Sequence, residues 1–543
     1  MDALGKNSFR IIPCMTFNKQ SIFTALCVLA ILLVAFVLRF AAFDHPLATN
    51  GAEGLRDLFV AKHALLYGEW PIGGHANGLS TIENSPLYYY LVILLALPGM
   101  SFLSVSFMYV LFQCLFILLV FLFARSVFGR GVGLVAALLL AISPHYVVNV
   151  TGFFIWPPYF AAPFVILSLF ALWVGYRDRK KTMVMVSPLL MLMALAIHQS
   201  TIAIIPLYAC IGLYVTHKIC FSFKHYGISL IASLVFATVL FIPPILASDL
   251  STFAWGTRIT EDSPITFGEG LHQTIVGIPY MFGMYGDPIK LHVEFALALL
   301  LVLVFWFFFH SNEIKERKKY LVLLLIFIAA EIAVALVFDP EGIPRHFEPV
   351  LWMAPVVLGV LIATPIRRSL FVSIIGIATL SLFVFSSLTD DRLMRTYPNI
   401  GLFDRPRYEL MEHAVDAMVD EINSLQVQNG YTDYTFFYIY VMLASKNDLS
   451  SSPLLFWLPL EERLGVRLDE SPNSYFRKVP VTHRDDYLFY ACFENRIGYS
   501  IEACLEQNEV LHPEHTTQKV VFEFSGNNNV AVYLAKRTKG MMP

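Results

Sequence analysis

Two carboxylates, Glu53 and Asp57, lie four residues apart in a stretch that separates two long apolar runs. A carboxylate can act as a general base because it can take a proton from a hydroxyl or an amine. Lys62 follows in the same stretch, and a cation there can bind a phosphate group. On the residues alone, Glu53 is explained most simply as a charge at the start of a helix, where the helix dipole favours an anion.

The segment that must position these side chains is predicted to be a helix over 55–67. Its apolar residues recur at helical spacing and form one stripe: Leu55, Leu58, Phe59, Ala61, Leu65 and Leu66. Arg56, Asp57 and Lys62 lie off this stripe, and Gly68 is expected to end the helix. This pattern predicts an amphipathic helix that lies at a membrane interface.

The composition places most of the chain in a membrane. Of the 543 residues, 57% are apolar and 15% are charged, whereas soluble proteins carry about 25% charge. The mean hydropathy is +0.63. Long apolar runs recur over 20–388, and a mixed, ordinary sequence follows. The net charge of −3 indicates no nucleic-acid partner.

Basic residues predict the topology because Lys and Arg gather on the cytoplasmic side. They form six packets: Lys6/Arg10/Lys19, Arg125/Arg130, Arg177/Arg179/Lys180/Lys181, Lys218/Lys224, Lys315/Arg317/Lys318/Lys319 and Arg367/Arg368. Placing all six inside gives eleven spans: 20–43, 103–124, 131–149, 157–175, 182–197, 200–216, 226–247, 288–309, 319–338, 348–364 and 368–388. The N-terminus is then cytoplasmic. The first span lacks a cleavage site and is predicted to be retained.

The apolar segment 86–98 is too short to span and ends at Pro98-Gly99. It is therefore predicted to be a re-entrant or surface-lying helix, which makes 44–102 one large outer loop. Long loops of this kind are usually functional. The predicted domains are a cytoplasmic N-terminus, 1–19, an all-α polytopic membrane domain, 20–388, with a second outer loop over 248–287, and an extracytoplasmic domain, 389–543.

The C-terminal part predicts a small α/β domain. Residues 405–425 have a helical period, and four strand-like runs follow: YTFFYIYVML, DYLFYACF, KVVFEFS and VAVYLAKR. Cys492 and Cys504 are its two cysteines. An exported domain with two cysteines can form a disulfide, and two buried thiols are the alternative.

The first outer loop carries further elements in a fixed order. After the predicted helix come Gly68-Glu69-Trp70, Asn77-Gly78 and the segment Glu83-Asn84-Ser85-Pro86-Leu87-Tyr88-Tyr89-Tyr90. This order resembles the GT-C glycosyltransferases, in particular the protein O-mannosyltransferase and aminoarabinose (lipid A) transferase group. Glu53 stands where the family has its catalytic Asp, with Asp57 as the alternative base. The family's second acidic position is Gly54 here, and Asn84 replaces a frequent lysine.

Later segments resemble the group more weakly. Tyr146, Trp156 and Pro158 match a passage after the third span, although no carboxylate lies between Ser143 and Pro163. His198 after the fifth span also matches, with a loop-capping histidine as the alternative. Arg345 and His346 match a passage before the tenth span.

The resemblance implies an inverting transfer of a sugar from a polyprenyl-phosphate donor to a glycolipid, polysaccharide or protein acceptor. Glu53 would be the base. Cations would stabilise the departing lipid phosphate, and the candidates are Arg345, Arg258, His346 and Lys62. For Arg345, the alternative is an ion pair with Asp339, Glu341 or Glu348. The predicted supporting or acceptor-site residues are Glu83, Asn84, Tyr88, Trp156 and His198.

No cofactor or metal is predicted because the outer loops lack a His/Asp cluster with metal-ligand spacing. Trp70 and the tyrosines over 88–90 are expected to form either an interfacial belt or a substrate groove. Two other functions stay open: a non-catalytic GT-C relative, and a transporter or flippase of lipid-linked sugars. Transporters usually show internal repeats, and none is evident here. Eleven spans, a short N-terminus and modest loops favour a bacterial inner membrane.

Overall fold

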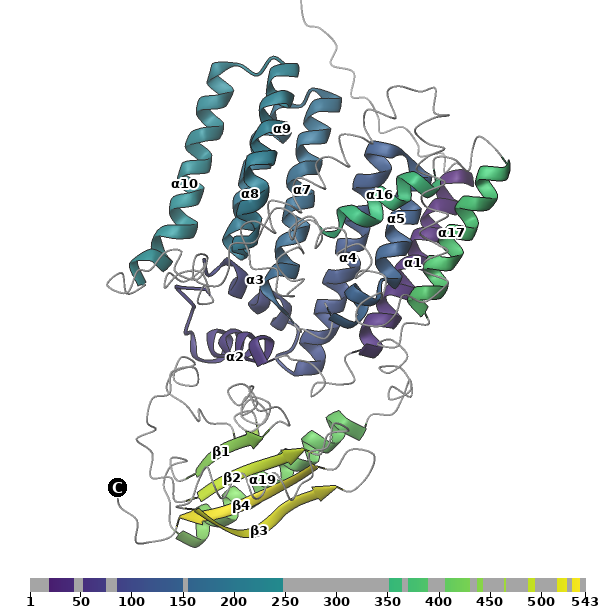
Figure 1. Ribbon diagram of the computed structural model, residues 1–543. Coiled ribbons are helices and arrows are strands. Elements are labelled where there is room, and N and C mark those ends of the chain that lie inside the picture. The colour runs from purple at the N-terminus through teal and green to yellow at the C-terminus, as the bar shows by residue number, and fades with distance from the viewer. Residues whose placement is uncertain are drawn as a thin grey trace, which may run out of the picture.

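A computed structural model describes most of the membrane domain and parts of the C-terminal region (Figure 1). The described residues are 19–42, 52–74, 85–149, 155–247, 351–363, 370–388, 406–429, 437–442, 463–464, 487–493, 515–524 and 530–537. The predicted spans 288–309 and 319–338 lie outside these ranges.

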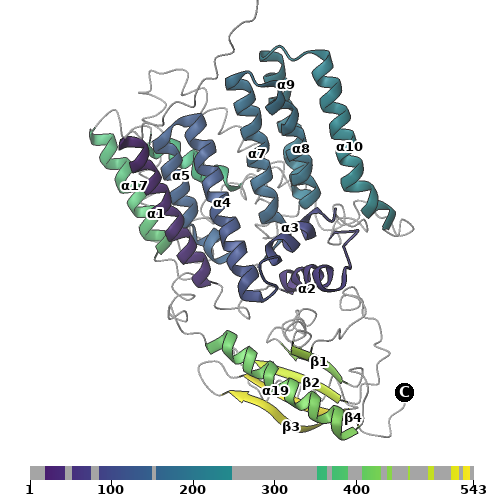
Figure 2. The same cartoon turned by 180° about the vertical axis from the view of Figure 1, so that it is seen from behind.

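The described helices form a bundle in which neighbouring helices run roughly side by side (Figures 1 and 2). Four are long and apolar enough to cross a membrane: α1 (Lys19–Ala42), α4 (Phe102–Phe128), α7 (Pro157–Asp178) and α10 (Phe223–Ala247). Shorter ones are α5 (Arg130–Ile142), α8 (Lys181–Ile197), α9 (Ile205–Lys218), α16 (Met353–Ala363) and α17 (Leu370–Leu388). Each of these nine helices overlaps a predicted span. The protein is therefore an integral membrane protein.

One predicted span is wrong in its extent. The segment 131–149 is not one helix, since α5 ends at Ile142 and a π-helix, η1 (His145–Asn149), follows. Pro144 explains the break. A proline lacks the N–H that a helix needs and disfavours helical backbone in the residue before it, and Ser143 has an extended ψ of 122°.

Small residues let the helices approach closely. A Cβ atom on Gly359 of α16 would lie 3.0 Å from the carbonyl oxygen of Val132 in α5. A Cβ atom on Gly175 of α7 would lie 2.4 Å from a methyl carbon of Val184 in α8. Close backbone packing of this kind stabilises helix pairs in membranes, where burying apolar surface from lipid gives little free energy.

Hydrogen bonds join three neighbouring helices inside the bundle. The hydroxyl of Ser168 in α7 donates to the carbonyl of Ser187 in α8 at 2.8 Å, and the Ser187 hydroxyl donates back to the Ser168 carbonyl at 2.8 Å. Tyr208 of α9 lies 2.6 Å from the Ser187 hydroxyl. These contacts link α7, α8 and α9 to one another.

The first outer loop forms two helices at one end of the bundle (Figure 1). The first, α2 (Ala52–Tyr67), ends where predicted: Gly68 has a φ of +71° and its N–H donates to the Ala64 carbonyl at 3.2 Å. The second, α3 (Leu87–Ala96), has ten residues, a length of about 15 Å or half of the hydrocarbon thickness. It packs against α2, α4 and α8. Its length fits the predicted re-entrant or surface-lying helix.

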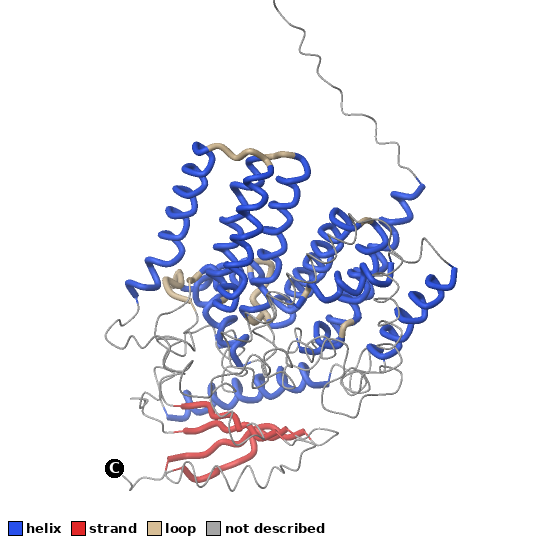
Figure 3. Tube along the Cα trace, turned by 45° about the horizontal axis from the view of Figure 1, so that its top comes forward, coloured by secondary structure: helices blue, strands red, loops and turns tan. Residues whose placement is uncertain are grey.

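The C-terminal region lies at the same end of the bundle as α2 (Figure 1), and its strands lie together below the helices in Figure 3. Its helix, α19 (Pro406–Asn429), packs against a sheet of β1 (Phe437–Met442), β2 (Tyr487–Phe493), β4 (Val530–Arg537) and β3 (His515–Phe524), in that spatial order. The first pair is parallel and the other two are antiparallel. Lys519 Nζ lies 2.6 Å from Glu421 Oε2 and links β3 to α19. Cys504 lies outside the described residues, so the disulfide with Cys492 stays a prediction.

Candidate active site

The polar face of α2 is buried, which the sequence did not predict. An interfacial amphipathic helix would leave Asp57 and Lys62 towards water, but Asp57 is 0% exposed and Lys62 is 2% exposed. His63 is buried as well. These polar residues of the predicted amphipathic helix are therefore buried rather than exposed to water. The physical reason is that α3 packs against α2 and supplies a hydrogen-bonding group to its carboxylate.

Tyr88 supplies that group and joins three segments of the chain. Its hydroxyl donates to Asp57 Oδ2 at 2.7 Å and also lies against the carbonyl oxygen of Ile155. Asp57 belongs to α2, Tyr88 to the first turn of α3, and Ile155 to the segment directly before α7 (Pro157–Asp178). We call the contact of Asp57, Tyr88 and Ile155 the loop junction.

Local sequence places Tyr88 at this point. The backbone N–H of Leu87 donates to the Ser85 hydroxyl at 3.3 Å, a side-chain contact that favours a turn over continued helix. Pro86 has a φ of −68° and stands just before the helix, as proline does at helix starts. Helix α3 therefore begins beside the end of the first loop, with Tyr88 in its first turn.

Ile155 has an unusual backbone conformation, with a φ of +43°. A positive φ is a genuine outlier for a β-branched residue and costs about 1–3 kcal/mol, so it persists only where the surroundings enforce it. Ile155 is fully buried, and its carbonyl contacts Tyr88. The next residues, Trp156 and Pro157, are the N-cap and first residue of α7. The loop junction therefore lies directly before a membrane helix.

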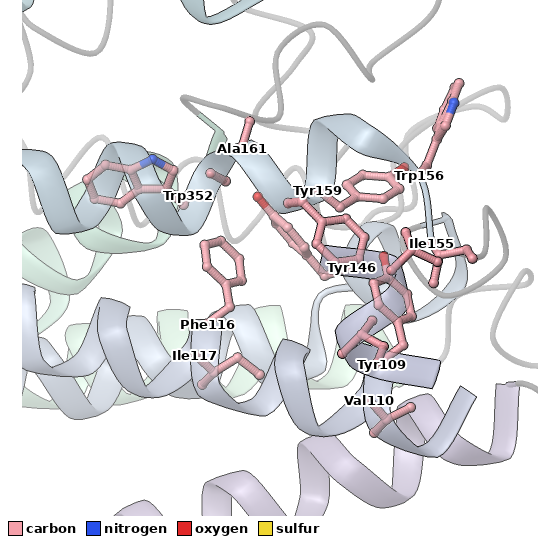
Figure 4. Packing of buried hydrophobic residues seen from close by; sticks show 14 of the residues in the cluster. Tyr109, Val110, Phe116, Ile117, Tyr146, Ile155, Trp156, Tyr159, Ala161 and Trp352 are labelled. Carbon is pink, nitrogen blue, oxygen red and sulfur yellow. The ribbon is translucent and has the colours of Figure 1, made fainter. Parts of the chain in front are cut away.

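Buried aromatic rings pack directly against the loop junction. The Phe160 ring lies 5.5 Å from the Tyr88 ring, 5.6 Å from Tyr109 and 4.8 Å from Phe112, measured between centroids. Tyr109, Tyr146 and Tyr159 gather near Ile155 and Trp156 (Figure 4). These tyrosine rings are buried. In a buried environment a hydrogen bond is stronger than in water, and a polar group without a partner costs more free energy.

The Gly68-Glu69-Trp70 element returns to both helices of the loop. His63 lies between the rings of Phe59 and Tyr67, and its Nδ1 atom is 3.4 Å from Glu69 Oε2. Trp70 is 54% exposed and stacks on Tyr90, with centroids 6.3 Å apart. The Tyr90 hydroxyl donates to the Pro71 carbonyl at 3.1 Å. The element therefore fastens the end of α2 to α3, and Trp70 has the exposure expected of an interfacial residue.

Arg39 near the end of α1 is a buried residue that the sequence analysis missed. Its guanidinium donates to the carbonyls of Ala141 at 2.8 Å and Leu140 at 3.0 Å. These carbonyls belong to the last turn of α5, which lacks helical partners and favours a cation. The available signal was a lone arginine inside an apolar span, since such residues are costly and rarely incidental. Arg39 fastens α1 to α5 at the end where the first outer loop begins.

His198 takes the capping geometry. It precedes the 3-10 helix η2 (Gln199–Ile204), and its Nδ1 accepts from the Ser200 backbone N–H at 3.3 Å. The same nitrogen is 2.6 Å from the Ser200 hydroxyl. The structure thus shows the capping contact, while a role for His198 in a substrate site stays a prediction.

The other predicted site residues are placed only in part. The backbone of Glu53 belongs to the first turn of α2, but its side chain lies outside the described residues. Five more lie wholly outside: Glu83, Asn84, Arg258, Arg345 and His346. Within the described ranges, no group of three or more His, Cys, Asp or Glu side chains is placed to hold a metal ion.

Comparisons with known proteins find similarity in structure alone. No family model and no curated protein matches the chain. ArnT from Cupriavidus metallidurans in the apo state matches with a TM-score of 0.55 and 13% identity, over 95% of this chain and 98% of that one. The same enzyme bound to undecaprenyl phosphate matches with a TM-score of 0.49 and 11% identity, over 94% and 98%.

The archaeal oligosaccharyltransferase AglB from Archaeoglobus fulgidus, in complex with an inhibitory peptide and a dolichol-phosphate, matches with a TM-score of 0.46. The identity is 12%, over 87% of this chain and 69% of that one. Of these three, the apo ArnT match carries the comparison, and at 13% identity it shows the fold. The chain therefore has the fold of ArnT, a GT-C fold, as the resemblance in its first outer loop predicted.

Proposed function

We propose that the protein is a glycosyltransferase that moves a sugar from a polyprenyl-phosphate donor to an acceptor on the outer side of the membrane. The observation that carries the proposal is the loop junction, in which Tyr88 joins the buried carboxylate of Asp57 to Ile155, just before α7. This contact holds α2, α3 and the segment before α7 together next to buried aromatic rings, so it gives the residues of the first loop a fixed position. The fold shared with ArnT and the motif order of the first loop support the same activity.

Glu53 is the proposed base. It stands four residues before Asp57 in α2, and residues four apart share one face of a helix. A base must reach the proton that it removes. Asp57 is buried and bonded to Tyr88, so it serves better as a positioning residue that holds α2 against α3 and the segment before α7. The carboxylate base implied by the resemblance is thus assigned to the first turn of α2.

The donor phosphate requires positive charge on its departing oxygen, because negative charge develops there during transfer. Arg345, Arg258, His346 and Lys62 are the proposed ligands. Lys62 is buried on the same helix as Asp57. The proposed acceptor is a glycolipid, polysaccharide or protein. The reaction as proposed inverts the sugar configuration without a metal or another cofactor, in a bacterial inner membrane with the C-terminal domain in the periplasm.

The test compares surface glycans, glycolipids and lipid extracts by mass spectrometry in a strain that lacks the gene. The strain is complemented with wild type, Glu53→Gln, Glu53→Asp or Glu523→Gln at matched protein level. Glu523 is an exposed residue of β3, so Glu523→Gln is a control of identical chemistry. Wild type and Glu523→Gln should restore a mass shift of one sugar on the acceptor. Glu53→Gln should lower the product by about a hundredfold, since a lost general base costs 10²–10⁴ in rate.

Each outcome separates the alternatives. Accumulation of a polyprenyl-phosphate sugar in the deletion strain and in Glu53→Gln identifies the donor. Glu53→Asp, whose carboxylate is displaced by about 1 Å, should keep part of the activity. Full restoration by Glu53→Gln would show that Glu53 is a helix-start charge. A deletion strain without any change in glycans or donor would favour a non-catalytic GT-C relative.

A further inference from the structure

Residues of α1 and α4 line a groove. It begins at the ends of these helices that lie away from α2 and α3 (Figure 2). Its volume is about 380 Å³. The walls are apolar and consist of Val28, Leu29 and Leu32 from α1 and Leu118 and Phe121 from α4. Leu32, the α1 wall residue nearest to Arg39, precedes it by seven residues, or roughly 10 Å along the helix. None of the residues that line the groove belongs to the loop junction.

The end of the groove nearest the start of α1 is polar and carries positive charge. Ser21, Thr24 and Arg125 line it. The exposed Arg125 guanidinium lies 5.8 Å from the centroid of the Phe121 ring. Arg130 stands at the same end, where it donates to the Gln20 carbonyl at 3.3 Å. Within the described part of the chain, no carboxylate forms an ion pair with Arg125.

The side chains around the groove indicate that it faces the lipid of the membrane. Gln20–Phe40 of α1 is long and apolar enough to cross a membrane, and its exposed side chains next to the groove are large and apolar, with Leu29 63% exposed. Hydrocarbon chains therefore surround this surface. The basic packets predict that the starts of α1 and α5 face the cytoplasm, where anionic lipids give the leaflet a negative potential.

We propose that this groove binds an anionic phospholipid of the cytoplasmic leaflet. Its phosphate lies on Arg125, since a guanidinium is well suited to bidentate phosphate binding. One acyl chain lies between α1 and α4, along Val28, Leu32 and Leu118. The bound lipid extends the packing of α1, and a ligand that binds the folded state stabilises that state by mass action.

The test uses the full-length protein, purified in detergent and stripped of lipid. Equimolar phosphatidylglycerol and phosphatidylethanolamine are added, and native mass spectrometry measures the retained adducts. Wild type should retain phosphatidylglycerol over phosphatidylethanolamine. Arg125→Gln should lower the phosphatidylglycerol adduct about fivefold, the effect of one basic residue on an anionic lipid. Ala25→Trp should lower both adducts, because Ala25 lines the groove and the larger ring fills it.

Lys218→Gln is the matched control. Lys218 also ends a helix at the cytoplasmic side and lies over an aromatic ring, 5.7 Å from the Tyr214 centroid, but it does not line the groove. This variant should retain lipid as wild type does. Phosphatidylglycerol should also raise the thermal midpoint of wild type and of Lys218→Gln, and should raise that of Arg125→Gln by less.

Three outcomes would overturn the proposal. If wild type and Arg125→Gln retain both lipids equally, Arg125 does not bind the lipid phosphate. Unchanged adducts in Ala25→Trp would place the lipid elsewhere. Lipid binding that appears only after deletion of residues 2–18 would show that the chain's own N-terminus occupies the groove.

Discussion

Replacement of Tyr88 by phenylalanine probes the loop junction with a single atom. The change removes the hydroxyl that donates to Asp57 at 2.7 Å and contacts the Ile155 carbonyl, while the ring keeps its place against Phe160. Hydrogen bonds to charged groups contribute about 1.5–3 kcal/mol, and a buried acceptor left without its donor costs a similar amount. We therefore expect a destabilisation of about 2 kcal/mol.

The same loss should appear in activity because the junction positions α2. If half or more of this free energy is lost from the transition state, the transfer rate falls about five- to thirtyfold. The assays are the thermal midpoint of the purified protein and the initial rate of sugar transfer in membrane vesicles. Tyr90→Phe is the matched control, two residues away, since the exposed Tyr90 hydroxyl donates only to the Pro71 carbonyl. It should change stability by less than about 0.5 kcal/mol.

A double-mutant cycle with Asp57→Ala, which removes the acceptor of the Tyr88 hydroxyl, isolates the pair. Because both changes remove the same hydrogen bond, the double variant should be little worse than either single variant, with a coupling of about 1 kcal/mol or more. Tyr88→Phe that matches Tyr90→Phe in stability and rate would refute the reasoning. Strict additivity in the cycle would do the same, because it would mean that Tyr88 and Asp57 act independently.

Two further variants test how the bundle is held together. Arg39→Gln removes a buried cation from the last-turn carbonyls of α5 and should destabilise the protein by about 2 kcal/mol, whereas Arg177→Gln at an exposed site should cost less than about 1 kcal/mol; equal thermal midpoints for the two would contradict the assigned role of Arg39. Gly359→Val places atoms against the α5 backbone and should destabilise the protein by about 1–3 kcal/mol. Gly212→Val is the control, because a Cβ atom there has nothing within 4 Å, and it should have a smaller effect in the same thermal assay. Similar losses of stability in both variants would show that the α5–α16 contact is not tight.

The sequence alone determined where the described membrane helices lie. Hydropathy and charge are local properties, so they predicted the positions of the nine helices and the short length of α3. Single residues set several boundaries. Gly68 ends α2 because glycine adopts a positive φ without strain, and Pro144 separates α5 from η1 because it cannot continue a helix. Pro144 indicated this break, but the apolar residues on both sides of it led to the prediction of one continuous span over 131–149.

The tertiary structure decided which residues meet. Periodicity divided α2 into an apolar and a polar face, but it could not show that α3 covers Asp57. Tyr88 and Ile155 are 67 residues apart in the chain, and the Arg39 contact with Ala141 joins residues 102 apart. Such contacts depend on how separate helices pack rather than on any local pattern. For this reason, the sequence placed the candidate carboxylates in one loop, and only the packing of α2, α3 and the segment before α7 showed that Asp57 is buried and bonded to Tyr88.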